Sequence, residues 1–149
     1  RSAARQINHI KSLYPNAAII YVGPSDMARK NGLKMESYPL IQAFKQALRT
    51  EVLARGAVYW DLYDVMGGEG SMVQWVDQEP AFAVKDYIHF TPKGAQWVGN
   101  KLAEMVELAQ ENYRAEKHRL AAEAERREDS VRACNAAPVD TAAQDSIAP

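Results

Sequence analysis

Two short apolar runs, separated by a helical pattern, constrain the fold of this chain most. The first, AAIIYVGP at residues 17–24, is rich in β-branched side chains and stops at Gly23-Pro24. The second, AVYWDLYDV at residues 57–65, predicts a strand that ends near Asp61 or Leu62. Short, continuous apolar runs of this kind are typical of buried parallel strands.

Helical patterns lie before, between and after these two runs. They cover residues 1–13 and residues 37–55, and a third, long pattern begins at Thr91. Strands that alternate with helices pair in parallel and form a layered α/β fold. Two strands are few for such a sheet, and the sequence begins in mid-helix. We therefore expect the C-terminal part of a longer protein, whose missing N-terminal part would complete the same domain.

Between these elements the sequence predicts loops and short turns. Residues 24–37 are polar and predict a loop, and Ser37 is a candidate cap for the helix that follows, with Pro39 in its first turn. Residues 71–76 predict a short helical turn that Ser71 caps, and residues 77–90 predict mainly loop.

The chain divides into three parts by composition. Residues 1–113 predict the folded domain, and residues 114–128 predict a helical extension rich in Glu, Arg and Ala. Residues 129–149 contain Ala, Asp, Ser, Thr and Pro without periodicity, which predicts disorder. The charged extension is either a solvated helix or a surface for a partner.

Charge and cysteine content argue against several classes of partner. The formal net charge is -1, from 18 basic and 19 acidic residues, so no basic footprint for nucleic acid is present. No stretch approaches the roughly 20 apolar residues of a membrane span. The single cysteine, Cys134, excludes an internal disulfide and argues against a metal cluster. We expect no metal and no cofactor.

The segment KDYIHFTPKG, residues 85–94, carries the strongest chemical signal. Asp86 stands three residues before His89, and Thr91 and Pro92 follow as the start of a helix. An Asp carboxylate that accepts a hydrogen bond from one imidazole nitrogen leaves the other nitrogen free to act as a base. The segment follows the second strand, and ligands of open parallel sheets bind outside the carboxyl ends of the strands. The alternative is that Asp86 is a turn residue and His89 a half-buried filler.

A second candidate segment follows the first strand. Ser25, Asp26 and Met27 come directly after Pro24, so we expect them at the same edge of the sheet, as a wall of the substrate site. Ser25 is better interpreted as a turn residue than as a nucleophile. The tryptophans either line a sugar site or pack in the core: Trp60, Trp75 and Trp97.

Three segments together resemble one family. DYIHFTPKG resembles the Asp-x-x-His-Phe-Thr-x-x-Gly block near the C-terminus of SGNH/GDSL-type hydrolases. IIYVGPSDM and VYWDLYDVMGGEGSMVQWV resemble earlier segments of bacterial SGNH esterases, in the same order. The resemblance covers about residues 1–110.

The resemblance implies a flavodoxin-like three-layer α/β/α fold and a serine esterase without a cofactor. His89 would be the general base and Asp86 its orienting carboxylate. The substrate would be a small-molecule or carbohydrate ester of acetyl or another short acyl group. The family also suggests a periplasmic or secreted location.

The sequence departs from the family at the nucleophile. Neither the Gly-Asp-Ser motif nor the Gly-x-Asn-Asp motif of the oxyanion hole occurs, and the two Asp-Ser pairs follow Glu128 and Gln144. We therefore expect the serine upstream of this chain and no activity from the chain alone. The alternative is a non-catalytic α/β scaffold that binds a partner through the charged C-terminal helix.

Overall fold

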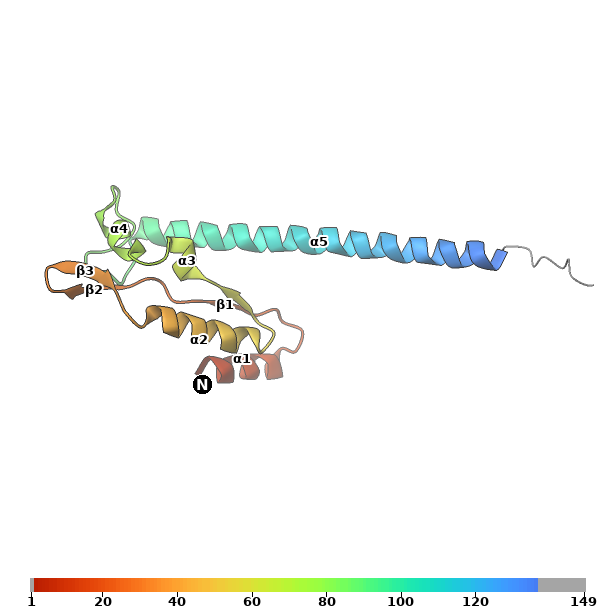
Figure 1. The fold of residues 1–149 in the computed structure, drawn as a ribbon, viewed down its shortest axis with the longest axis horizontal. Helices are drawn as coiled ribbons and strands as arrows, with labels where there is room; N and C mark the ends of the chain where they lie inside the picture. The colour runs from red at the N-terminus through yellow and green to blue at the C-terminus, as the bar shows by residue number, and fades with distance from the viewer. Residues whose placement is uncertain (1, 137–149) are drawn as a thin grey trace, which may run out of the picture. The chain divides into compact units, whose positions relative to one another are not determined.

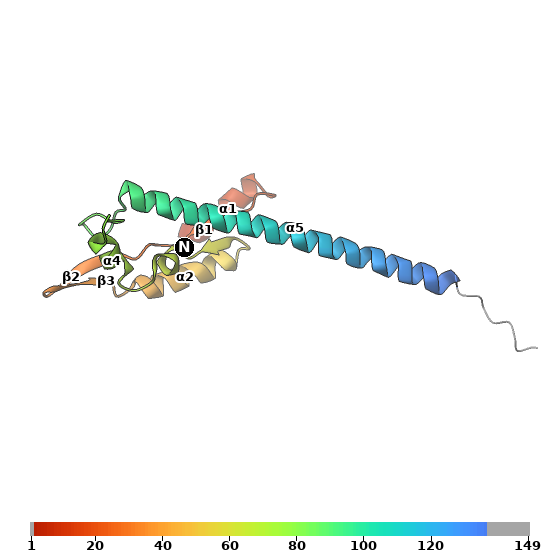
Figure 2. The same ribbon diagram turned by 90° about the horizontal axis from the view of Figure 1, so that it is seen from above.

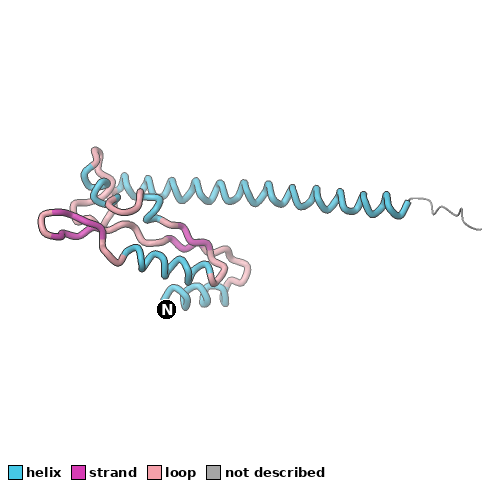
Figure 3. Tube along the Cα trace, in the orientation of Figure 1, coloured by secondary structure: helices cyan, strands magenta, loops and turns pink. Residues whose placement is uncertain are grey.

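The computed structural model describes residues 2–136 (Figures 1 and 3). This part of the chain consists of helices, short strands and the loops between them. In order they are α1 (Ser2–Leu13), β1 (Ile20–Val22), β2 (Ala28–Asn31), β3 (Lys34–Ser37), α2 (Ile41–Leu53), β4 (Val58–Trp60), α3 (Leu62–Met66), α4 (Ser71–Asp77) and α5 (Pro92–Ala136).

The central feature is a parallel sheet made by β1 and β4. Ile20 lies opposite Val58, and Val22 lies opposite Trp60. Helices α1 and α2 contact one another. Together they cover one face of the sheet through a core of Ile7, Val52 and Ala57, with Ile19, Tyr21, Leu48 and Tyr59 packed against it. The predicted α/β fold with a parallel sheet is confirmed.

The other face of the sheet is partly open within the described residues. Of the side chains that alternate with Tyr21 and Tyr59, Trp60 is buried at 7% exposure, whereas Ile20 is 41% exposed, Val22 42% and Val58 50%. Parallel sheets normally carry helices on both faces. The described chain therefore leaves apolar sheet surface without a cover.

Residues 24–37 are not the predicted loop, because most of them form a β-hairpin. Strands β2 and β3 pair antiparallel, with Arg29 opposite Glu36 and Asn31 opposite Lys34. A two-residue turn joins them, and its Gly32 has a φ of 62°, a conformation that glycine adopts without strain. Charged side chains hide the strand pattern, although Asn31-Gly32 is a hairpin signal.

The start of α2 also differs from the prediction. The helix begins at Ile41 after Leu40, and no side chain caps it. Ser37 lies in β3 instead, where its hydroxyl donates to Asp26 Oδ2 at 3.0 Å and accepts from the Gly70 amide at 2.8 Å. The cap prediction is wrong because these longer-range hydrogen bonds use the hydroxyl. Likewise Ser71 is the first residue of α4, and Gly70 is the residue before the helix.

Helix α3 was not predicted, and Asp61 begins it. The Asp61 carboxylate accepts a hydrogen bond from the Asp64 amide at 3.2 Å, an N-cap contact. Lys45 of α2 reaches both carboxylates, at 3.2 Å from Asp61 and 2.6 Å from Asp64. Burial lowers the pKa of Lys45, but the hydrogen bonds to Asp64 and Asp61 outweigh it, so the pKa is raised. This cluster ties α2 to the turn after β4.

Helix α5 ends later than predicted. Contacts divide the chain into a unit that ends at Ala103 and a second unit from Glu104 onward. Helix α5 continues to Ala136, so the predicted disorder is wrong for residues 129–136. Residues 137–149 lie outside the described part.

Disorder was predicted for residues 129–136 because they show no apolar periodicity. The absence of such periodicity means that no helix face is apolar, but it does not exclude a helix. Residues 116–128, from which the helix continues, consist mainly of good helix formers, and there Arg119 pairs with Glu116 and Glu123 one turn away on either side. Within residues 2–136, no helix is long and apolar enough to cross a membrane. No group of three or more His, Cys, Asp or Glu side chains in this range is placed to hold a metal ion.

Candidate active site

Asp86 and His89 form a hydrogen-bonded pair. Nδ1 of His89 lies 2.7 Å from Oδ2 of Asp86. The other carboxylate oxygen, Oδ1, accepts hydrogen bonds from the backbone amides of Ile88 and His89, each at 3.0 Å. The carboxylate thus closes a turn with one oxygen and orients the ring with the other. The predicted pair and the predicted turn are the same structure.

The backbone of this turn is held by further hydrogen bonds. The amide of Tyr87 donates to the Val84 carbonyl at 2.9 Å, and the amide of Val84 donates to the His89 carbonyl at 2.8 Å. Tyr87 has a φ of 60°, in the left-handed region that residues other than glycine rarely adopt. Such conformations persist where surrounding contacts fix them, often at functional sites.

The environment of Asp86 keeps its carboxylate ionised. Hydrogen bonds from the His89 amide, the His89 ring and the Ile88 amide lower the pKa of Asp86 to about 2. In the tautomer that carries the proton on Nδ1, the ring donates to this carboxylate and Nε2 is free to accept a proton. The His89 side chain is 76% exposed, so the interpretation of His89 as a half-buried filler is wrong.

The segment continues into α5 through Thr91 and Gly94. The Thr91 hydroxyl donates to the Ala81 carbonyl at 2.9 Å and accepts from the Gly94 amide at 3.2 Å. The predicted cap is therefore confirmed. A Cβ atom on Gly94 would collide with the carbonyl of Phe82, so only glycine allows the first turn of α5 to approach the loop this closely.

An aromatic cluster lies against the same loop. The Trp75 ring lies 5.4 Å from the rings of Phe82 and Phe90 and 5.1 Å from that of Trp97, measured between centroids. Trp75 and Trp60 are buried, at 6% and 7% exposure, so the core interpretation applies to both. The cluster packs the residues on both sides of the Asp86–His89 turn against α4 and α5.

The structure places the segment after β1 beside this turn. The Ala28 amide donates to the Tyr87 carbonyl at 3.0 Å, a contact that sequence spacing does not reveal. Asp26 is fully buried, and its Oδ2 accepts hydrogen bonds from the Ser37 hydroxyl and the Met72 amide, each at 3.0 Å. Its carboxylate thus holds β3 and α4 together. Ser25 and Met27 are half-buried.

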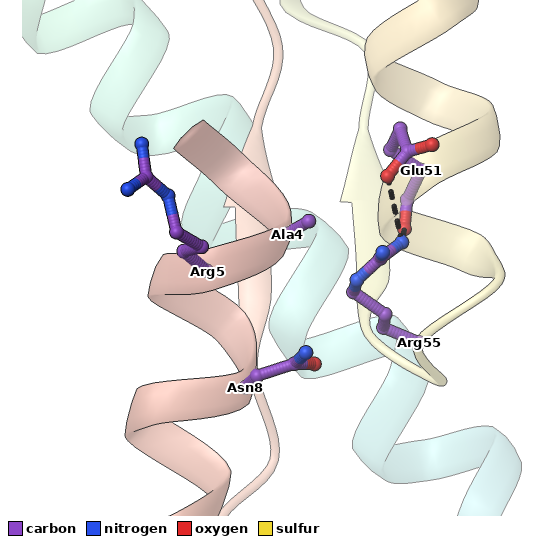
Figure 4. A pocket seen from close by; sticks show the side chains of 5 residues that line it. All are labelled: Ala4, Arg5, Asn8, Glu51 and Arg55. Atoms are coloured by element: carbon purple, nitrogen blue, oxygen red, sulfur yellow. Dashed lines mark hydrogen bonds and ion pairs between the residues drawn. The ribbon is translucent and has the colours of Figure 1, made fainter. Parts of the chain in front are cut away.

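Of two surface pockets within the described residues, one includes a residue of the predicted substrate wall. Met27 contributes to an open apolar pocket of about 470 Å³, whose other lining residues are Tyr38, Leu40, Ile41, Ala43 and Phe44. A second pocket is lined by residues of α1 and by Glu51 and Arg55 near the end of α2 (Figure 4). There Arg55 pairs with Glu51 at 2.8 Å. Neither pocket is lined by Asp86 or His89.

Comparison with solved structures finds a neighbour with a known description. The structure is similar to that of a peptidoglycan O-acetylesterase, with a TM-score of 0.65 and 23% sequence identity. The match covers 72% of this chain and 30% of that one, so this chain spans less than a third of its neighbour. No protein-family model matches the sequence, and a comparison with curated proteins finds no match. The chain therefore shares the α/β fold of an esterase.

Proposed function

We propose that this chain is part of an SGNH-type serine esterase and supplies the acid–base half of its active site. The observation that carries the proposal is the 2.7 Å contact between Asp86 and the Nδ1 atom of an exposed His89 ring. The substrate is an acetyl or other short acyl ester, carried by a carbohydrate. The fold shared with a peptidoglycan O-acetylesterase supports this substrate class.

In the proposed reaction, Nε2 of His89 accepts the proton of a serine hydroxyl as the serine oxygen attacks the ester carbonyl. Asp86 holds the ring in the correct tautomer and stabilises the imidazolium that forms. His89 then donates the proton to the leaving alcohol, and an acyl-enzyme remains. Water hydrolyses the acyl-enzyme with His89 again acting as the base, which restores the serine.

The serine and the oxyanion hole lie outside these 149 residues in this proposal. The chain lacks both motifs that would supply them, Gly-Asp-Ser and Gly-x-Asn-Asp. We propose that a preceding part of the same domain contributes them and also covers the open face formed by Ile20, Val22 and Val58. The high exposure of the His89 ring supports this, since catalytic bases work in sites that exclude bulk water.

The test is the variant His89→Ala in the full-length protein, with hydrolysis of an acetyl ester as the measurement. We expect kcat to fall by roughly 10³-fold or more, as removal of a triad base does, with the thermal unfolding temperature unchanged. The matched control is His118→Ala, which removes an exposed histidine from the charged part of α5. If the His89 variant keeps near-normal activity, the chain is instead a scaffold.

A further inference from the structure

The β2–β3 hairpin carries three cations and one carboxylate, so it has a local excess of positive charge. Arg29, Lys30 and Lys34 are all exposed, and none forms an ion pair within residues 2–136. The one acidic residue of the hairpin, Glu36, accepts a hydrogen bond from the Asn31 side chain at 2.7 Å. The whole chain has a net charge of -1, so this local excess does not reflect a basic protein.

The hairpin distributes these charges along a ribbon. Successive side chains of a strand alternate between faces, so Lys30 points to one face and Arg29 to the other. Lys34 lies opposite Asn31 and shares the face of Arg29. At about 3.3 Å per residue, the charged strands extend over roughly 10 Å. The hairpin forms a narrow, extended ribbon (Figures 2 and 3). Cations spread along such a ribbon suit several anionic groups along a polymer better than they suit one small anion.

The base of this hairpin is fixed to the candidate active site. Ala28, the first residue of β2, donates its amide hydrogen to the Tyr87 carbonyl in the turn between Asp86 and His89. At the end of β3, Ser37 is hydrogen-bonded to the buried Asp26. Lys30 lies two residues, or about 7 Å, along the strand from Ala28. The cationic part of the hairpin therefore begins directly after the residue that contacts the Asp86–His89 turn.

We propose, resting on the proposed esterase function, that the β2–β3 hairpin binds a carboxylate-bearing polysaccharide and holds its ester groups near His89. Cations spaced along a ribbon match carboxylates spaced along a sugar chain. A membrane surface is the less favoured partner, because the tip presents one fully exposed leucine, Leu33, beside the polar Asn31 and Gly32. That apolar area is smaller than stable anchoring in a bilayer requires.

The binding test compares two variants of the full-length protein that lose equal charge. The hairpin variant is Arg29→Gln, Lys30→Gln, Lys34→Gln; the control is Arg114→Gln, Lys117→Gln, Arg126→Gln, at exposed positions of α5. The probe is polygalacturonate, with its fully methyl-esterified form as the neutral polymer. We expect the hairpin variant to bind polygalacturonate about tenfold more weakly and the control to change less than about twofold. Equal losses in both variants, or equal wild-type binding of the neutral polymer, would overturn the proposal.

A kinetic measurement separates this proposal from the esterase assignment. The hairpin variant should lose about tenfold in kcat/KM for acetylated polygalacturonate and keep the wild-type value for p-nitrophenyl acetate. If the wild type hydrolyses neither ester, the esterase assignment fails, while polygalacturonate binding still decides the role of the hairpin. Stronger binding to anionic phospholipid vesicles than to polygalacturonate, lost in the hairpin variant, would assign the hairpin to a membrane and refute the polysaccharide.

Discussion

Asp86 divides its two oxygens between the backbone and the ring of His89. Oδ1 accepts from two amides and Oδ2 contacts the ring, so the same carboxylate shapes the turn and orients the base. The spacing Asp-x-x-His allowed this pair to be predicted, because both residues lie in one short segment. The buried contacts of Asp26 could not be predicted, since its partners Ser37 and Met72 lie 11 and 46 residues away.

The titration of Asp86 provides a test at this scale. Its pKa of about 2, against an ordinary 3.8, means that the folded turn favours the ionised carboxylate. The stabilisation is therefore fully present above about pH 4 and is lost as the pH falls through 2. In His89→Ala the ring contact disappears while the backbone amides remain, so the pKa should rise part of the way to 3.8. Carboxyl NMR shifts measure it.

A matched control for this titration is His9→Ala, which removes an exposed histidine from α1. The titration of Asp86 should not change in that variant. If His89→Ala also leaves the Asp86 titration unchanged, the ring does not contact the carboxylate in solution.

At the scale of elements, the position of α5 depends on its first turn. Thr91 caps the helix, and Gly94 lets it approach the carbonyl of Phe82. This contact holds the helix against the loop that carries His89. The same helix contains a second glycine, Gly99, beside which there is open space.

The two glycines give a matched pair of substitutions with opposite expected signs. Gly94→Ala forces its Cβ atom against the Phe82 carbonyl and should lower the free energy of unfolding by about 1–3 kcal/mol. Gly99→Ala meets no atom and should raise it by about 0.5–1 kcal/mol, because alanine favours helix. Urea denaturation measures both. A stabilising Gly94→Ala would show that the helix does not lie close to Phe82.

The elements that the sequence predicted best are those with apolar periodicity. Helices α1 and α2 and strands β1 and β4 each bury apolar side chains against one core, and their sequences show it. The β2–β3 hairpin escaped prediction because half of its strand residues are charged and most of it is exposed. Helix α3 was missed because it follows β4 within two residues, and the apolar run continues through both.

At the scale of the whole molecule, the sheet has one covered face and one face that is partly open within the described residues. Ile20, Val22 and Val58 would be buried if the rest of a three-layer fold lay against them. The small number of strands in the sequence led to the expectation of a longer protein. It could not indicate which residues would be left exposed, because that depends on which face α1 and α2 cover.

The variant Val58→Glu tests whether a longer protein covers this face. In the 149-residue chain Val58 is half exposed, so we expect the free energy of unfolding to fall by less than about 1 kcal/mol. In the full-length protein the new carboxylate would be buried without a partner, and the loss should reach roughly 3 kcal/mol or more. Denaturant titration of both proteins gives the comparison.

The control for this comparison is Val131→Glu, at an exposed position of α5, which should have a small effect in both proteins. If Val58→Glu has the same small effect in the full-length protein as in the chain alone, the face stays open and the proposed completion of the domain is wrong.

The hydrogen bonds around Asp86 also bear on the order in which the site forms. All three join residues only two or three positions apart. Hydrogen bonds between residues so near in sequence need only very short loops to close. They therefore form early and do not depend on distant segments. A serine supplied by another part of the chain would arrive last. Hydrolytic activity would then appear only at the final docking step, and partly folded molecules would remain inert towards esters.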